Sequence, residues 1–325
     1  MLDQLGHYKI LDRIGSGGLG DVYRARDTRA GRTVAVKVPG DLVADAEMRQ
    51  RLIHDAQAAT SLSHPNIATL YEVGEDDGRL FLALEFVPGE PLGRLIAGHP
   101  LNPRRAIQFA IQIADALADA HAAGILHQDI RPENIVITPK GNAKILDFGL
   151  AAWTTNGRAR ETASTSFDRR SGEVARTLLY ASPEQARGEP IDERTDLFSL
   201  GIVLFEMLTG RTPFRDSVPH ALRRQIVTQA VPRASSSNRT VPADLDAALG
   251  KVLEKRAEKR FESAATFAAA LRQIDAALEQ RTERAEPAVE IKPLRPVRAE
   301  KTFPWWLVAL AAGGIAAAAA AWFLL

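Results

Sequence analysis

A glycine-rich segment, residues 15–20, lies between two stretches in which apolar and polar residues alternate. Such alternation predicts β-strands, here Tyr8–Ile14 and Asp21–Arg26. Glycines let backbone N–H groups approach phosphate oxygens without a side-chain clash, although a glycine-rich turn can also be purely structural. A dinucleotide-binding loop would need a helix directly after the glycines, and the strand-like residues that follow speak against it. The segment therefore indicates a hairpin that can cover a phosphate group.

The patterning changes from strand-like to helix-like near residue 87, after which the chain is mainly helical. This order predicts an α+β protein with two lobes: a small β-rich N-lobe over about 8–86 and a larger α-helical C-lobe over about 87–278. Further strands are predicted at Thr33–Val38, Ile67–Val73 and Leu80–Phe86, an amphipathic helix at 44–62, a helix at 103–123 and a buried helix at 197–208.

Charge and composition exclude some classes of protein. The formal net charge is +1, so no overall field selects nucleic acid, and we expect no nucleic-acid partner. There is no cysteine, which excludes disulfides and thiolate metal sites. The sequence gives no indication of the oligomeric state.

Four further motifs follow the glycine-rich segment. A strand ends on Lys37, and a lysine at this distance from a glycine loop can place its ammonium group on nucleotide phosphates. The others are His127-Gln128-Asp129-Ile130-Arg131-Pro132-Glu133-Asn134, Asp147-Phe148-Gly149 and Ala181-Ser182-Pro183-Glu184. Each string alone could be a solvated loop, but the ordered set makes coincidence improbable.

Together these motifs resemble those of the eukaryotic-like serine/threonine protein kinases of bacteria. The resemblance implies a bilobal protein-kinase-like fold over residues 8–278 and transfer of the ATP γ-phosphate to Ser/Thr hydroxyls of protein substrates, with Mg²⁺ or alternatively Mn²⁺. It implies that Lys37 holds the α- and β-phosphates, and that Asp129 accepts or orients the substrate hydroxyl proton. It also implies that Asn134 and Asp147 ligate the metal.

The same resemblance implies the nucleotide-binding residues and two structural contacts. Leu84 corresponds to the gatekeeper, Glu85 to Val87 to the hinge that contacts adenine, and Glu184–Arg260 to a buried ion pair. Asp196 should brace the catalytic loop. The residues expected around ATP are Ile14, Gly15, Ser16, Gly17, Gly18, Leu19, Gly20, Val22, Ala35, Lys37, Leu84, Glu85, Val87 and Val136.

Three positions depart from the family pattern. Asp55 replaces the glutamate that pairs with the lysine and is one methylene shorter, so we expect a weaker pair. Gln128 replaces an arginine that binds a phosphorylated activation loop, so activity should depend little on phosphorylation of Thr162, Ser164, Thr165, Ser166 or Ser171. Arg131 replaces a lysine, and its guanidinium can still bind the γ-phosphate.

These departures leave other functions open. A pseudokinase scaffold would bind nucleotide or partner proteins with little phosphotransfer, and Asp55, Gln128 and Arg131 favour it. Retention of Lys37 and Asp129, with both expected metal ligands, favours an active enzyme. A small-molecule phosphotransferase is a third alternative. The 177–184 segment argues against it, because it suggests a platform for a polypeptide substrate.

The end of the sequence predicts a membrane anchor. Residues 279–302 read as a charged linker broken by prolines, and residues 303–325 contain no charged side chain. A helix of that length spans the roughly 30 Å hydrocarbon core of a bilayer, although a buried helix docked on the domain is the alternative. Lys292, Arg295, Arg298 and Lys301 precede it and favour a cytoplasmic kinase domain, so we expect a single-pass, tail-anchored protein of the cell membrane.

Overall fold

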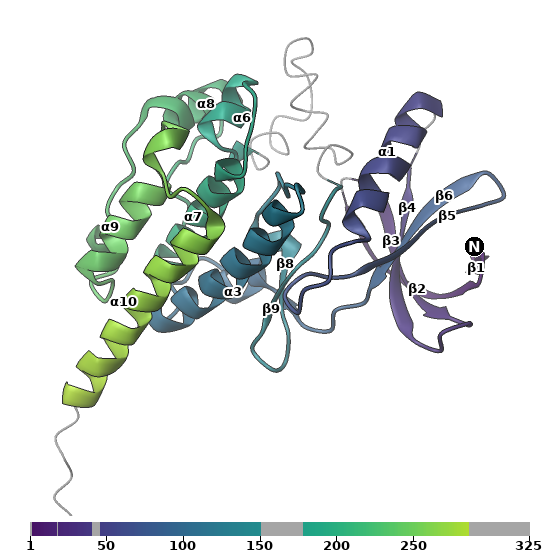
Figure 1. The fold of residues 1–325 in the computed structure, drawn as a ribbon, viewed down its shortest axis with the longest axis horizontal. Helices are drawn as coiled ribbons and strands as arrows, with labels where there is room; N and C mark the ends of the chain where they lie inside the picture. The colour runs from purple at the N-terminus through teal and green to yellow at the C-terminus, as the bar shows by residue number, and fades with distance from the viewer. Residues whose placement is uncertain (1, 18, 41–45, 151–177, 286–325) are drawn as a thin grey trace, which may run out of the picture. The chain divides into compact units, whose positions relative to one another are not determined.

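The computed structural model describes residues 2–17, 19–40, 46–150 and 178–285. Residues 1–281 form one compact unit. Within it a β-rich lobe with one long helix lies beside a helical lobe, and the β8–β9 hairpin lies between them (Figure 1). The predicted α+β, bilobal architecture is confirmed for the described residues.

The N-lobe is an antiparallel sheet with strand order β1-β2-β3-β4-β6-β5 and helix α1 beside it. Its two faces carry separate apolar clusters. Val34, Val36 and Phe81 belong to a small cluster on one face, whereas Leu82 and Leu84 join the main core on the other. The elements are β1 Gln4–Leu5, β2 Tyr8–Gly17, β3 Gly20–Asp27, β4 Thr33–Pro39, α1 Ala46–Ala59, β5 Leu70–Asp76 and β6 Arg79–Glu85.

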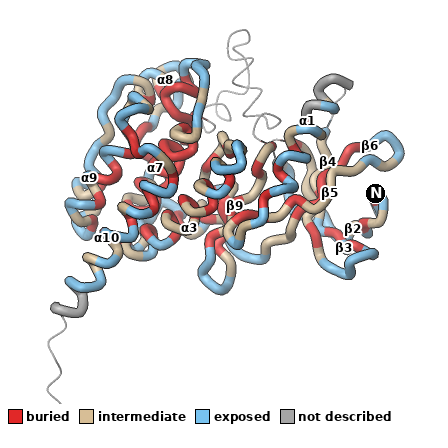
Figure 2. The backbone as a smooth tube through the Cα atoms, in the orientation of Figure 1, coloured by how far each residue is buried: buried red, intermediate tan, exposed pale blue. Residues whose placement is uncertain are grey.

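The C-lobe is built around α7, Arg194–Thr209, whose side chains are buried on nearly all sides, as the apolar run predicts (Figure 2). Helix α3, Pro103–Ala122, packs against α7 and begins at Asn102, whose side chain accepts hydrogen bonds from the N–H groups of Arg104 and Arg105. The other elements are β7 Glu90–Pro91, α2 Leu92–Ile96, β8 Ile135–Ile137, β9 Ala143–Ile145, α6 Pro183–Arg187, α8 Pro219–Thr228, α9 Ala243–Val252 and α10 Ala264–Ala285.

Two element boundaries differ from prediction for physical reasons. Strand β2 continues through Gly17, because Gly15 and Gly17 pair with Val22 and Gly20. Strand β5 begins at Leu70 rather than Ile67, because the preceding residues bond to the C-lobe. The N–H of Ala68 donates to Ile145 O (2.8 Å), and Ile67 forms a parallel bridge with Ile145.

The proposed membrane anchor, residues 303–325, and most of the linker before it lie outside the described residues. In the portion of the chain that the structure describes, no helix is long and apolar enough to cross a bilayer.

Candidate active site

The predicted adenine and phosphate contacts of the N-lobe share one face of the sheet. Val22 lies opposite Lys37, and Ala35 lies opposite Leu84. Directly paired residues of antiparallel strands project on the same side, so these four side chains form one surface. Leu82 and Leu84 on this face of the sheet belong to the main core, which includes the C-lobe. The predicted nucleotide contacts of the N-lobe therefore face the C-lobe.

The glycine-rich hairpin closes by an approach that only glycine allows. Gly20 has φ +150°, and a Cβ there would lie 2.1 Å from Val38 O. Leu19 is buried, whereas Ile14 stands in an irregularity of the β2–β3 ladder with 44% of its surface exposed. An exposed isoleucine beside a predicted nucleotide site offers an apolar surface that a bound base would cover.

The catalytic loop holds Asp129 and Asn134 together. Asn134 Nδ2 donates to Asp129 Oδ2 (3.0 Å) and to Asp129 O (2.9 Å). The ring of His127 accepts from the N–H of Asp129 at Nδ1 (3.2 Å), and its Nε2 donates to Leu146 O (2.8 Å). His127 is fully buried, and its ring connects Asp129 itself with Leu146, the residue before Asp147.

Asp196 braces this loop from α7, as predicted. Its carboxylate accepts from the N–H groups of His127 (2.8 Å) and Gln128 (2.6 Å) and from His121 Nε2 (2.9 Å). Burial alone would raise the pKa of Asp196, but His121, His127 and the backbone donors hold it below its usual value. Asp196 therefore stays ionised inside the C-lobe.

Asp147 and Lys37 meet across the two lobes, with Lys37 Nζ donating to Asp147 Oδ1. Phe148 is buried and packs edge-on against the His127 ring, with centroids 4.7 Å apart. Gly149 has φ +74°, and a Cβ there would lie 3.0 Å from Asp55 O. Helix α1 thus packs directly on the segment that carries Asp147.

Asp55 lies at the edge of the buried face of α1 rather than within it. Leu52, Ala56 and Ala59 are buried, but 43% of the Asp55 side chain is exposed, with Oδ1 3.5 Å from His54 Nδ1. The Lys37–Asp55 pair stays a prediction.

The hinge residue Glu85 is fixed by its own side chain. Glu85 Oε2 accepts from Lys144 Nζ (2.8 Å) and from the N–H of Thr69 (3.3 Å), while Lys144 Nζ also donates to Ile67 O (3.2 Å). Lys144 lies on β9, the strand that leads into Asp147. This contact joins the hinge to the C-lobe, and the motif analysis missed it because 59 residues separate the partners.

Of the remaining predicted contacts, Val136 is buried on β8 and Val87 is half-buried after β6. Arg131 Nε donates to Glu133 Oε2 (2.8 Å), and its guanidinium lies 6.0 Å from the ring centroid of Tyr180. Burial would lower the pKa of Arg131, but the carboxylates of Glu133 and Asp129 raise it above its usual value. Arg131 is therefore a permanent cation near Asp129.

The donor groups of Asn134 and Asp147 fit a magnesium ion. Both amide hydrogens of Asn134 serve Asp129, which leaves its carbonyl oxygen as a ligand, and Asp147 adds a carboxylate. Leu146 N donates to Asn134 O (2.8 Å), so the two segments lie side by side. Mg²⁺ in nucleotide sites commonly takes its other ligands from phosphate and water, so two protein ligands are enough.

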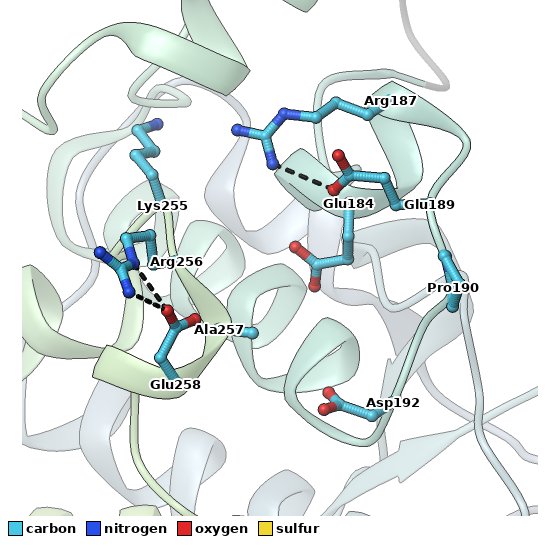
Figure 3. A pocket seen from close by; sticks show the side chains of 9 residues that line it. All are labelled: Glu184, Arg187, Glu189, Pro190, Asp192, Lys255, Arg256, Ala257 and Glu258. Atoms are coloured by element: carbon cyan, nitrogen blue, oxygen red, sulfur yellow. Dashed lines mark hydrogen bonds and ion pairs between the residues drawn. The ribbon is translucent and has the colours of Figure 1, made fainter.

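The predicted Glu184–Arg260 pair is confirmed as a buried, two-pronged contact of 2.7 and 2.8 Å. A pocket beside it is lined by charged side chains that pair with one another, Arg187 with Glu189 and Arg256 with Glu258 (Figure 3). The pocket contains none of the predicted ATP-binding residues, and four of its charged side chains already form the two ion pairs named above. We therefore do not place the active site there.

Lys255, which lines the same pocket, is a feature that sequence analysis missed. Its Nζ donates to Ile226 O (2.6 Å) and lies 3.9 Å from the ring centroid of Phe214. Burial and the neighbouring Arg260 lower its pKa to about 8. No motif marks this lysine, because its surroundings come from segments distant in sequence.

A two-lobed fold with Lys37, Asp129, Asn134 and Asp147 brought toward one another defines a phosphate-transferring domain of the kinase type. The chain belongs to the protein kinase family: the family model for the protein kinase domain matches residues 8–272.

Similar proteins are bacterial serine/threonine kinases. PrkC of Bacillus subtilis is 38% identical over 261 residues, covering 80% of this chain and 39% of PrkC. PknB of Mycobacterium tuberculosis is 37% identical over 270 residues, covering 81% of this chain and 42% of PknB. The chain thus spans less than half the length of these two relatives. A crystal structure of a mutant PknI kinase domain of M. tuberculosis has a TM-score of 0.65 at 25% identity, covering 84% of this chain and 97% of that one.

Proposed function

We propose that this chain is an active serine/threonine protein kinase that transfers the γ-phosphate of ATP to hydroxyl groups of protein substrates. The observation that carries the proposal is the hydrogen-bonded set in which Asn134 orients Asp129 while Lys37 holds Asp147. The bacterial serine/threonine kinases among its relatives support this choice of substrate class.

The mechanism follows from the positions of these groups. Asp129 takes the proton of the substrate hydroxyl while the hydroxyl oxygen bonds to the γ-phosphorus of ATP. At the same time the bond between that phosphorus and the β–γ bridging oxygen breaks, which releases ADP. Lys37 neutralises charge on the α- and β-phosphates, and Arg131 neutralises charge on the γ-phosphate. Mg²⁺, held by Asn134 and Asp147, would neutralise phosphate charge and align the phosphates.

A pseudokinase would keep the fold without the chemistry. Asp55, Gln128 and Arg131 stand where the family has other residues. They would abolish activity only if their presence disorganised the active site. The backbone of Gln128 is hydrogen-bonded to Asp196, and Arg131 is a half-buried cation close to Asp129. These contacts favour an active enzyme.

The test is phosphotransfer from labelled ATP with Mg²⁺ to the chain itself and to an added protein. Lys37→Met and Asp129→Asn should each lower the rate at least about a hundredfold, since each removes a group that acts in the transition state. Lys9→Met, which alters an exposed lysine of β2, is the matched control and should retain the wild-type rate. Equal rates in wild type and Asp129→Asn would contradict the proposal.

We further propose that residues 303–325 anchor the kinase in the cell membrane, with the kinase domain in the cytoplasm. The support is the sequence itself, an uncharged segment of sufficient length preceded by basic residues. Anchoring would restrict the substrates to proteins that reach the membrane surface.

A further inference from the structure

The peptide unit before Asp129 has an uncommon backbone conformation. Gln128 has φ +64°, in the left-handed region that residues other than glycine adopt only at a cost in free energy. Such a conformation persists when its surroundings hold it in place, and Gln128 directly precedes the group that we assign as proton acceptor.

Two contacts hold the backbone of Gln128, one through its N–H group and one through its carbonyl oxygen. The N–H of Gln128 donates to Asp196 Oδ1 on α7 (2.6 Å). Gln128 O accepts from Gln185 Nε2 on α6 (3.0 Å), although 57 residues separate the two partners. The backbone of Gln128 is therefore bonded both to the central helix α7 and to α6, the helix after the activation loop.

Gln185 uses both ends of its carboxamide. Its Oε1 accepts from the N–H of Ser182 (3.1 Å), and its backbone N–H donates to Ser182 Oγ (3.2 Å), which together form a capping box for α6. The side chain is 8% exposed, so water does not readily replace either partner. The cap fixes the rotamer, and the rotamer aims the amide nitrogen at Gln128 O.

We propose that Gln185 is a positioning residue for Asp129, through which the order of the 178–187 segment controls the orientation of the catalytic carboxylate. The proposal rests on the role of Asp129 given above. Gln185 is neutral and Asp196 is acidic. The two hydrogen bonds that they form with Gln128 therefore need neither a phosphate group nor an arginine at position 128. Displacement of α6 would remove the hydrogen bond from Gln185 to Gln128 O and leave the contact with Asp196.

Gln185→Glu separates the two roles of this side chain. Glutamate is the usual alternative in a capping box, so the contact with the Ser182 N–H is retained. A carboxylate cannot donate to Gln128 O and repels it. We expect kcat for an added peptide to fall about tenfold, because Gln128 O loses this buried donor and faces a negative charge instead, while KM for ATP stays within about twofold.

The pH dependence of kcat distinguishes a positioning role of Gln185 from a purely structural one. Burial raises the pKa of a carboxyl group, and a protonated carboxyl regains an O–H donor. The ratio of kcat for Gln185→Glu to kcat for wild type should therefore rise as the pH is lowered from about 8 to about 6. Gln185→Met, which cannot donate at any pH, should lose kcat without this recovery.

Asn102→Ala is the control for stability, because it removes the cap of α3 far from Asp129 in sequence. It should lower the melting temperature and leave kcat near wild type. Wild-type kcat in both Gln185 variants, or a Gln185→Glu defect that does not respond to pH, would overturn the inference. Absence of transfer by wild type would instead contradict the proposed function.

Discussion

Several contacts with neutral and acidic groups hold Asp129 and the residue before it in place. Asn134 binds its carboxylate, His127 binds its N–H, and Asp196 and Gln185 hold the preceding peptide. Of these partners, His127, Asp196 and Gln185 are buried in the C-lobe, and Asn134 is half-buried. These contacts explain how glutamine at position 128 is compatible with an organised site.

Asp55 is the residue where a single methylene should matter. We expect Asp55→Glu to raise kcat/KM for ATP about two- to fivefold, because the longer side chain can reach Lys37, and Asp55→Ala to lower it by a similar factor. Initial-rate measurements over a range of ATP concentrations give the comparison. Asp3→Glu makes the same chemical change at an exposed position and should have no effect. An Asp55→Ala variant with wild-type kinetics would exclude Asp55 as the lysine partner.

The family resemblance predicted the positions of Asp196 and of the Glu184–Arg260 pair, although these contacts join residues 69 and 76 positions apart. The Ser182-x-x-Gln185 spacing could have indicated a capping box, but nothing in it indicates the reach to Gln128. Lys144–Glu85 was missed for the same reason, because such contacts depend on how the lobes pack rather than on neighbouring residues.

At the scale of elements, α6 is joined to the segment after α9 by a buried ion pair. The Arg260 guanidinium binds both oxygens of Glu184 and also donates to Glu254 O (2.8 Å) and Arg194 O (2.9 Å). Burial would raise the pKa of Glu184, but Arg260 and Thr195 lower it from 4.5 to about 2. The pair thus fixes the helix that carries Gln185.

Removing this carboxylate should destabilise the fold in a pH-dependent way. Because the folded pKa is depressed, the contribution of Glu184 to stability is complete above pH 4.5 and is lost as the pH falls toward about 2. Glu184→Gln should cost about 3–5 kcal/mol at pH 7, since Arg260 stays buried without its partner, and this difference should shrink in acid. Urea unfolding at several pH values measures it.

Glu258→Gln is the matched control, because it breaks the exposed pair with Arg256 on the opposite side of the same pocket (Figure 3). It should leave the unfolding midpoint at pH 7 unchanged. Equal midpoints for Glu184→Gln and wild type at pH 7 would show that the buried pair does not hold α6 in place.

At the scale of the whole molecule, residues 1–281 form one unit and residues 282–325 a second. The predicted kinase domain ends at 278, close to this division, and its core is contained in the first unit. The predicted start of the linker at 279 is wrong, because α10, Ala264–Ala285, continues past that position and through the division. The sequence also could not predict the packing between the lobes, which depends on contacts between distant segments.

Deleting residues 303–325 should release an active kinase from the membrane. Full-length chain should sediment with membranes and require detergent for extraction, whereas the deletion variant should stay in the supernatant with its phosphotransfer rate retained. Ile315→Arg places a charge near the middle of the segment at a cost of about 2.5–3.5 kcal/mol, so it should shift protein toward the supernatant. Ile315→Leu is the matched control and should remain with the membranes. Full-length protein that is soluble without detergent would contradict the anchor, and loss of activity on deletion would instead favour a helix docked on the kinase domain.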